Sequence, residues 1–473
     1  MTTEKPTTPA GQSRPPEKQG LNSARPTLLE AVCNSQVTKV VMILLLTLVL
    51  QVPIWMIDGT IGERQRRNNE AEMEIAAKWG REQTVIGPIL TIPYERDIKQ
   101  MVQRDGINEE KVVSVQVEQA HFLAEELHIQ AKTDHSVRHR GIFEVPVFRL
   151  DLAINGHFAM PDFTEFDNKP DRILWDRATL TMLIADPRTI TNQAMLTWNG
   201  EKIDFKPGPG NTEQAGNGIH LSLKDRLSEG DTFTFASRLS LQGSRSLAFA
   251  PVAGTTTAAV EANWPDPSFQ GNWLPAEQSI SDNGFTAGWQ IASLGRNFPQ
   301  RWTRQGEVFQ QINGSQFGVD FITPVDTYRM VERSVKYQFL FLALTFVTLW
   351  LFEVLGGVRL HPLHYLLVGA GMCLFYLLLL SLAEHLAFLT AYLVAALAIV
   401  LLLAGYCAAI LGSSRRAAVV GGFVVLLYGY LYTLLVNQDY ALLAGSIGLF
   451  LLLATVMFLT RKIDWRRVST SAT

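Results

Sequence analysis

The sequence PLHYLLVGAGMCLFYLLLLSL, residues 362–382, decides the fold because it contains no Asp, Glu, Lys or Arg. A helix of this length is about 30 Å long, which matches the hydrocarbon core of a bilayer. The run is apolar on every side, whereas a helix packed on a soluble core presents one polar face. We therefore expect this segment to span a membrane.

Five other runs share this apolar character. They cover residues 37–57, 337–355, 386–411, 417–436 and 440–460. The first is not expected to be a cleaved signal peptide, because the polar residues 1–36 precede it and Ile54-Trp55-Met56-Ile57 has no small-residue cleavage pattern. The sequence predicts a multi-pass α-helical membrane protein with about six spanning helices.

Basic residues alternate between the short connections of these runs. They are Lys5, Arg14, Lys18, Arg25 and Lys39 up to the start of the first run, Arg359 after the second, Arg415 and Arg416 after the fourth, and Arg461, Lys462, Arg466 and Arg467 after the sixth. The connections 383–385 and 437–439 contain neither Lys nor Arg. Because Lys and Arg collect on the cytoplasmic side, we expect both termini in the cytoplasm and residues 58–336 outside it.

Residues 58–336 read as a large β-rich domain inserted between the first and second spanning helices. Short segments alternate between apolar and polar residues, as in 113–117, 127–131 and 179–182, and turn residues such as Asn155-Gly156 separate them. A helix is expected before them, over 71–79, with Gly80 as its stop. The pattern predicts antiparallel β structure, as one sandwich or two stacked β units.

The remaining segments complete the expected organisation. Residues 1–36 form a disordered cytoplasmic arm, 37–57 the first transmembrane helix, 58–336 the extracytoplasmic β-rich domain, 337–460 transmembrane helices 2–6, and 461–473 a cytoplasmic tail. The formal net charge of −3 gives no nucleic-acid signal. The cysteines are Cys33, Cys373 and Cys407, so the β-rich domain must be stable without disulfides.

Several motifs along the chain resemble the CreD family of bacterial inner-membrane proteins. They are VIGPILTIPY at 85–94, RGIFEVPVF at 140–148, PVDTY at 324–328, LFE at 351–353, HPLHYLLVG at 361–369, LFYLLLLSL at 374–382, DYALL at 439–443 and LTRKIDW at 459–465. The resemblance runs from about residue 55 to 465, although residues 200–290 contain no matching motif. It implies a bacterial inner membrane and a role in cell-envelope integrity. With the orientation expected from the loop charges, the β-rich domain would then lie in the periplasm. The resemblance implies no catalytic residues.

Known enzyme motifs are missing from the sequence. It contains no phosphate-binding loop, no HExxH and no dinucleotide-binding glycine pattern. His361 with His364, and His135 with His139, each lack a third metal ligand nearby. We therefore expect no enzymatic activity, cofactor or metal.

Three functions are compatible with these features. The favoured one is a non-enzymatic protein that supports envelope integrity or the envelope-stress response, with a periplasmic domain that binds an envelope protein or cell-wall component. The alternatives are a transporter or channel for a small solute or lipid, and an enzyme acting on lipid or peptidoglycan precursors. The expected partners include the lipid bilayer and exclude nucleic acid, and the oligomeric state stays open.

Eight polar positions near the membrane are candidates for function. They are Asp326, Glu332, Arg333, Glu353, Arg359, His361, Glu384 and His385. Arg329, Glu332, Arg333 and Lys336 fall on one helical face, where Glu332 can pair with Arg329 or Lys336. This neck is either a collar that sets helix depth or a coupling element that contacts Glu63, Arg64 and Arg66.

The other candidates also have a structural alternative. Glu353 is expected to form an ion pair with Arg359 across a hairpin, and a gate is the alternative. Glu384 and His385 form a polar turn between two apolar runs. They either keep that turn at the membrane surface or handle protons or substrate.

Overall fold

The computed structural model describes residues 36–104, 107–166, 169–210, 216–227, 232–303, 307–322, 327–356, 360–437 and 440–461. The chain forms two compact units. The helical unit comprises the chain up to Gly59 and from Val331 onward, and the β unit comprises Thr60–Met330. Asp326 and Arg359, two of the candidate positions, lie outside the described residues.

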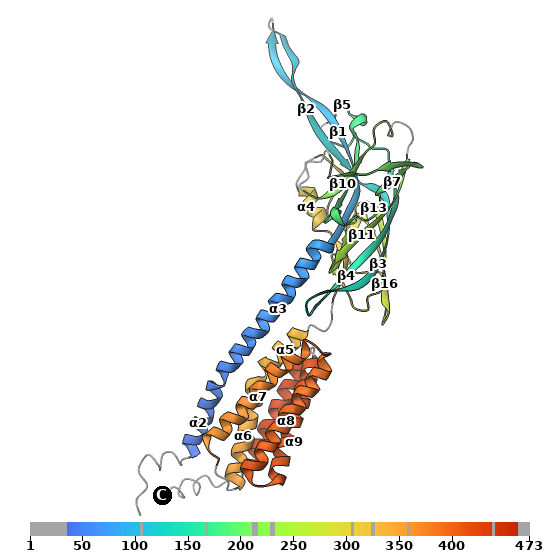
Figure 1. Cartoon of the computed structure of the whole chain (residues 1–473). Helices are drawn as coiled ribbons and strands as arrows, with labels where there is room; N and C mark the ends of the chain where they lie inside the picture. The colour runs from blue at the N-terminus through green and yellow to red at the C-terminus, as the bar shows by residue number, and fades with distance from the viewer. Residues whose placement is uncertain are drawn as a thin grey trace, which may run out of the picture. The chain divides into compact units, whose positions relative to one another are not determined.

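Apart from α4 Glu307–Asn313, with 7 residues, and α5, with 10 residues, the helices are long (Figure 1), and α6 to α10 are apolar. Their bounds are α2 Gln36–Val49, α3 Gln51–Trp79, α5 Thr327–Lys336, α6 Gln338–Gly356, α7 Pro362–Ala383, α8 Phe388–Leu411, α9 Ser414–Val436 and α10 Ala441–Thr460. In the described chain, four helical segments are long and apolar enough to cross a membrane: Thr38–Trp79, α7, α8 and α9. The helices α5 and α6, bent by 45° at their junction, give a fifth if they count as one span. The expected count of six stays a prediction.

The helix before the β strands is longer than expected. The sequence predicted a separate helix over 71–79, but α3 runs from Gln51 to Trp79. It ends where expected, because Gly80 has a φ of 155° and a Cβ there would lie 2.5 Å from the main-chain oxygen of Gln242. Only glycine fits such a close approach without strain.

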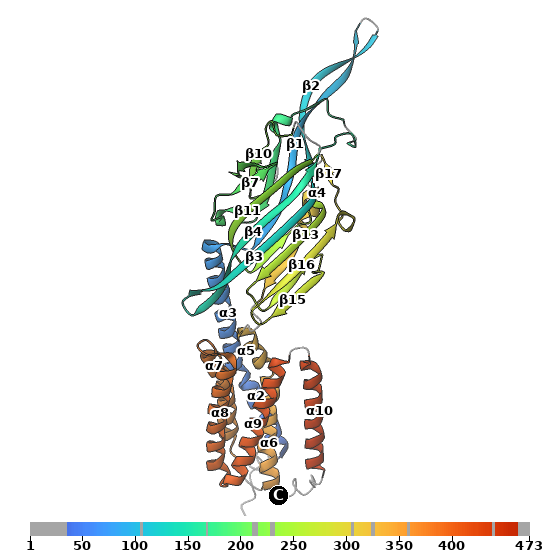
Figure 2. The same cartoon turned by 90° about the vertical axis from the view of Figure 1, so that its right-hand side faces the viewer.

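Two sheets make up the β unit. Sheet A contains β1 Gln83–Arg104, β2 Ile107–Phe122, β5 Arg172–Ile173, β6 Thr179–Ile184, β9 Lys206–Pro207, β10 Gly218–Ser222, β12 Ser246–Phe249, β14 Pro267–Gly271, β17 Arg301–Trp302 and β18 Phe317–Phe321. Sheet B has the order β15-β16-β13-β3-β4-β11-β7-β8 (Figure 2). Its bounds are β3 Ala124–Arg140, β4 Phe143–Ala159, β7 Met195–Trp198, β8 Glu201–Asp204, β11 Thr232–Ser244, β13 Ala253–Ala262, β15 Glu277–Ser281 and β16 Gly284–Ala292.

The strands bury one face and expose the other. Along β11, Phe233, Phe235, Leu239 and Leu241 are buried, and the residues between Phe233 and Leu239 alternate as the strand period requires. Buried residues of both sheets form one hydrophobic cluster. Each such side chain contributes roughly 1.5–3 kcal/mol through burial.

Two features of the sheets differ from the prediction. Most strand pairs are antiparallel, but β1 pairs with β12, and β13 with β3, in parallel. Asn155-Gly156 does not form a turn and lies inside β4. A Cβ at Gly156 would lie 2.0 Å from the main-chain oxygen of Glu126 on β3, so this glycine allows two strands to approach closely.

Candidate functional site

The neck helix α5 is tied to the end of another helix of the helical unit. Arg333 donates hydrogen bonds to the main-chain oxygens of Leu434, at 3.0 Å, and Leu435, at 3.2 Å. Both carbonyls belong to the last turn of α9, where no helical N–H follows to pair with them. Arg333 therefore caps α9 with a positive charge, which also suits the negative end of the helix dipole.

Glu332 makes the contact that its spacing predicted. Its carboxylate lies 2.8 Å from the ammonium group of Lys336, one helical turn later. Both side chains are more than a third exposed, so this pair contributes little to stability. The predicted contact of the neck with Glu63, Arg64 and Arg66 would join the two units and stays a prediction.

Glu353 has a partner that the sequence interpretation did not name. Its carboxylate, with 4% of the side chain exposed, forms an ion pair with Lys39 of α2 and accepts a hydrogen bond from the Tyr365 hydroxyl of α7 at 3.2 Å. The predicted pair with Arg359 falls outside the described residues. Glu353 lies near the end of α6, so its contacts join α2, α6 and α7. The cation of Lys39 and the hydroxyl donor of Tyr365 together compensate the burial of the carboxylate.

The signal for this pair was present in the sequence. Lys39 and Glu353 are single charges of opposite sign within two apolar runs, and each lies near the same expected side of the membrane. Charges at membrane depth pair with one another far more often than they stand alone.

His361 and the turn after α7 have local roles. His361 is the N-cap of α7, where its Nδ1 accepts a hydrogen bond from the Leu363 N–H at 3.2 Å. His364 lies 2.8 Å from the hydroxyl of Tyr406 on α8. Glu384 is the C-cap residue of α7, and the exposed His385 donates its main-chain N–H to Leu382. These contacts stabilise helix ends and a helix pair.

The last turns of α3 are anchored to the β unit. The Trp79 ring lies under the guanidinium of Arg138 at 4.3 Å, and its indole N–H donates to the main-chain oxygen of Phe148 at 3.3 Å. Glu74 pairs with Arg140 at 2.8 Å. Cation–π and ion-pair contacts of this kind fix the helix end to the strands β3 and β4.

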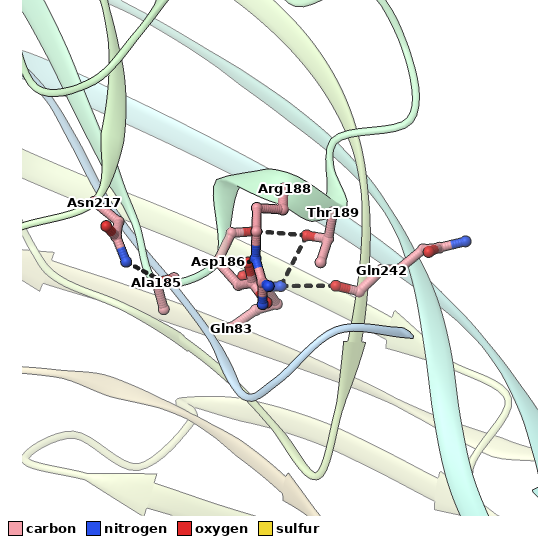
Figure 3. Close-up of polar contacts among 7 residues, drawn as sticks. All are labelled: Gln83, Ala185, Asp186, Arg188, Thr189, Asn217 and Gln242. Carbon is pink, nitrogen blue, oxygen red and sulfur yellow. Dashed lines mark hydrogen bonds and ion pairs between the residues drawn. The ribbon is translucent and has the colours of Figure 1, made fainter. Parts of the chain in front are cut away.

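A buried polar cluster lies where β1 begins (Figure 3). The Gln83 amide donates to the main-chain oxygen of Gln242 at 2.7 Å and to the Thr189 hydroxyl at 3.0 Å. The Thr189 hydroxyl donates in turn to the main-chain oxygen of Asp186 at 2.7 Å. Because β1 belongs to sheet A and Gln242 to sheet B, Gln83 links the two sheets immediately after α3.

An ion pair between the buried Asp186 and the exposed Arg188 lies at the solvent side of this cluster. The Arg188 guanidinium donates two hydrogen bonds of 2.8 Å to the Asp186 carboxylate. These bonds lower the pKa of Asp186 below its ordinary value. The cluster is a structural joint, since its donors and acceptors are bonded to one another except for the Gln83 amide oxygen, which has no partner among the described residues.

The exposed face of sheet B carries an open groove of about 950 Å³. Its lining comes from six adjacent strands, β15, β16, β13, β3, β4 and β11. None of the described residues that line it is aromatic. The described residues also contain no group of three or more His, Cys, Asp or Glu side chains that could hold a metal ion. The groove therefore provides space for a ligand and an amide- and hydroxyl-bearing surface.

Comparisons with known proteins agree with the motifs in the sequence. The family model described as "Inner membrane protein CreD" matches residues 35–466. The chain belongs to this family. A protein named "Inner membrane protein CreD" from Escherichia coli (strain K12) is 32% identical over 419 residues, which cover 88% of this chain and 91% of the relative. The family resemblance and the membrane location that it implies are thus confirmed.

Solved structures add nothing to this assignment. An M1 zinc metallopeptidase from Deinococcus radiodurans aligns over 46% of this chain and 53% of its own, with 8% identity and a TM-score of 0.17. A score this low carries no argument about fold or activity.

The groove is the feature that sequence analysis missed. Alternation along residues 127–131 marked His128 and Gln130 as one face of a strand. Alternation does not say which residues of other strands lie beside them, because that depends on register across the whole sheet.

Proposed function

We propose that this chain is a non-enzymatic inner-membrane protein that supports cell-envelope integrity, and that its β unit binds an envelope component in the groove of sheet B. The groove is the observation that carries this proposal. Its volume suits a ligand of several residues, and its floor is open to solvent. Family membership supports the membrane setting. The charge of the loops supports a periplasmic position for the β unit and cytoplasmic termini.

In this proposal the helices anchor the β unit and relay its state. Two elements support the relay: the continuous helix α3, whose end is fixed by Trp79 and Glu74, and the neck α5, which caps α9 through Arg333. A change in how the strands hold the end of α3 would then act along this continuous helix.

The proposal is tested by filling the groove. Ala259 is exposed on β13 in the groove, whereas Thr255 lies on the same face of the same strand, outside it. Cells that carry Ala259→Phe should lose the exclusion of an envelope-impermeant dye to the level of a deletion strain. Cells with Thr255→Phe should keep it. Equal dye exclusion in both variants, at equal protein abundance, would refute the proposal.

One observation favours transport of a small solute as a second candidate. The Lys39–Glu353 pair places two charges among spanning helices, where ionisable groups often line a pathway. Uptake by liposomes containing the purified protein tests this. Flux of protons, cations or small anions that is lost in Glu353→Gln would support transport, and flux equal to that of empty liposomes would exclude it for those solutes.

A further inference from the structure

The strand register arranges the groove into two straight rows of outward side chains. The first row, read from β15 to β11, is Glu277, Gly288, Ala259, Gln130, Ala153 and Arg238. The second row is Ser279, Thr286, Glu261, Lys132, Asp151 and Ser240. Both rows run across the strands. A ligand in the groove therefore also lies across the strands.

The first row forms a low floor with a charge at each end. Gly288, Ala259 and Ala153 place at most one carbon above the sheet, so a main chain can approach closely. Among the described residues, neither Arg238 nor Glu277 forms an ion pair. Within the described part of the chain, the floor thus offers a cation on β11 and an anion on β15 that have no ion-pair partner.

The second row is a wall that contains one matched ion pair and one carboxylate that is bonded to a hydroxyl group. Lys132 and Glu261 form an ion pair at 2.7 Å, and Ser240 donates to Asp151 at 2.9 Å. What remains along the groove for a ligand is the Asp151 carboxylate, hydroxyl groups and the Gln130 amide. The floor itself is charged only at its two ends, Arg238 and Glu277, and the wall adds one negative charge at Asp151.

The spacing of strands gives the length of a fitting ligand. Six strands at about 4.8 Å separate the two ends by roughly 24 Å, which is the length of about seven extended residues. The absence of aromatic side chains from the described lining counts against flat or cyclic ligands, which bind largely through aromatic surface. An extended main chain instead needs donors, acceptors and a low floor.

These observations point to an extended polar peptide as the ligand, with an acidic group over Arg238 and a basic group over Glu277. This inference rests on the proposed function and specifies its ligand. The peptide has small or polar residues between its charged ends, because the floor between those ends contains no apolar pocket that could take a large apolar side chain. Either a chain end or a side chain supplies each charge.

The test measures binding of two fluorescent seven-residue peptides to the full-length protein in nanodiscs of uncharged lipid. Both peptides have capped termini and a Gly/Ser interior. One has Asp at one end and Lys at the other, and the second has Lys at both ends. The wild-type protein should bind the Asp/Lys peptide about threefold to tenfold more tightly, as expected for one exposed charge contact.

Reversing the charge at one end of the groove should reverse the peptide preference, and an unfolded variant could not show this result. Arg238→Glu makes both ends of the groove acidic, so this variant should prefer the Lys/Lys peptide by a similar factor. Gly288→Phe should abolish binding of both peptides. This variant is compatible with the fold, since a Cβ at Gly288 would meet only atoms of Glu277 at 3.9–4.0 Å. The control Thr255→Phe should bind like the wild type.

The outcomes separate this inference from the proposed function. Equal binding of the two peptides by the wild type, or an unchanged preference in Arg238→Glu, overturns the peptide assignment. If Ala259→Phe still removes dye exclusion in cells, the groove keeps its function and takes another ligand. If Ala259→Phe leaves dye exclusion unchanged and the wild type binds the two peptides equally, both proposals are wrong.

Discussion

Lys39 of α2 and Glu353 of α6 form an ion pair although 314 residues separate them in the chain. Only 4% of the Glu353 side chain and 19% of the Lys39 side chain are exposed. A charge removed from water at this depth is tolerated because its partner and the Tyr365 hydroxyl compensate it. The pair therefore holds the first helix against the C-terminal bundle.

Breaking this pair from one side should destabilise the bundle more than removing both charges. Glu353→Leu leaves a buried ammonium group and should lower the free energy of unfolding by about 3–5 kcal/mol. The double variant with Lys39→Met should recover most of that loss. Unfolding in mixed detergent micelles measures both. Losses that simply add in the double variant would contradict the pairing.

The stability of the packing between α5 and α9 should depend on Arg333 and not on Glu332. Arg333→Ala removes two charge-assisted hydrogen bonds to the end of α9 and should cost about 2 kcal/mol. Glu332→Ala breaks an exposed pair and should change stability by less than about 0.5 kcal/mol. Amide exchange in the last turn of α9 reports the loss directly. Equal exchange in the two variants would show that the cap contributes nothing.

Buried His121 should make the β unit sensitive to acid. Burial against Trp302 and Phe309 lowers the pKa of His121 from 6.5 to about 4, so the folded protein holds the ring neutral. The unfolded chain binds a proton near pH 6.5. The free energy of unfolding therefore has its full value above pH 6.5 and falls by about 3 kcal/mol as the pH is lowered to 4.

Replacing the ring tests this dependence. His121→Gln keeps a polar partner for the Thr91 hydroxyl, which lies 2.9 Å from the ring, but does not titrate. The midpoint of thermal unfolding, followed by Trp fluorescence, should then fall less between pH 7 and 4.5 than in the wild type. The exposed His385→Gln is the matched control. Identical pH profiles for all three proteins would contradict the prediction.

Two glycines near the start of the β unit should respond to alanine with opposite signs. Gly80→Ala forces a Cβ to within 2.5 Å of the Gln242 oxygen at a φ of 155°, and should cost about 1–3 kcal/mol. Gly62 lies inside α3, and a Cβ added there would meet nothing within 4 Å, so Gly62→Ala should stabilise by about 0.5–1 kcal/mol. Thermal unfolding of the full chain compares them.

Cysteine labelling can test the membrane orientation that the loop charges predict. In a background without Cys33, Cys373 and Cys407, Lys202→Cys on the exposed strand β8 should react with a membrane-impermeant maleimide in cells with a permeabilised outer membrane. Arg415→Cys should react only after lysis. If only Arg415→Cys were labelled in intact cells, the topology would be the reverse of the predicted one.

The sequence by itself determined that the chain has long apolar helices, that the domain is rich in β structure, and to which family the chain belongs. Apolar runs such as 362–382 need no tertiary information, because the bilayer fixes the length and the composition of a helix that crosses it. The pairing of Glu332 with Lys336 and the stop at Gly80 were also predictable. The pairing depends on neighbours within one turn of the chain, and the stop was marked by a glycine, whose backbone can leave the helical conformation.

The tertiary structure alone decided the partners that lie far apart in the chain. Lys39 meets Glu353, Gln83 joins two sheets, and Arg238 and Glu277 end the same row of side chains. Each of these depends on helix packing or on strand register, which emerge from the burial of the whole core. A strand shifted by one residue would turn Arg238 inward and remove the groove, so no local pattern can specify that groove.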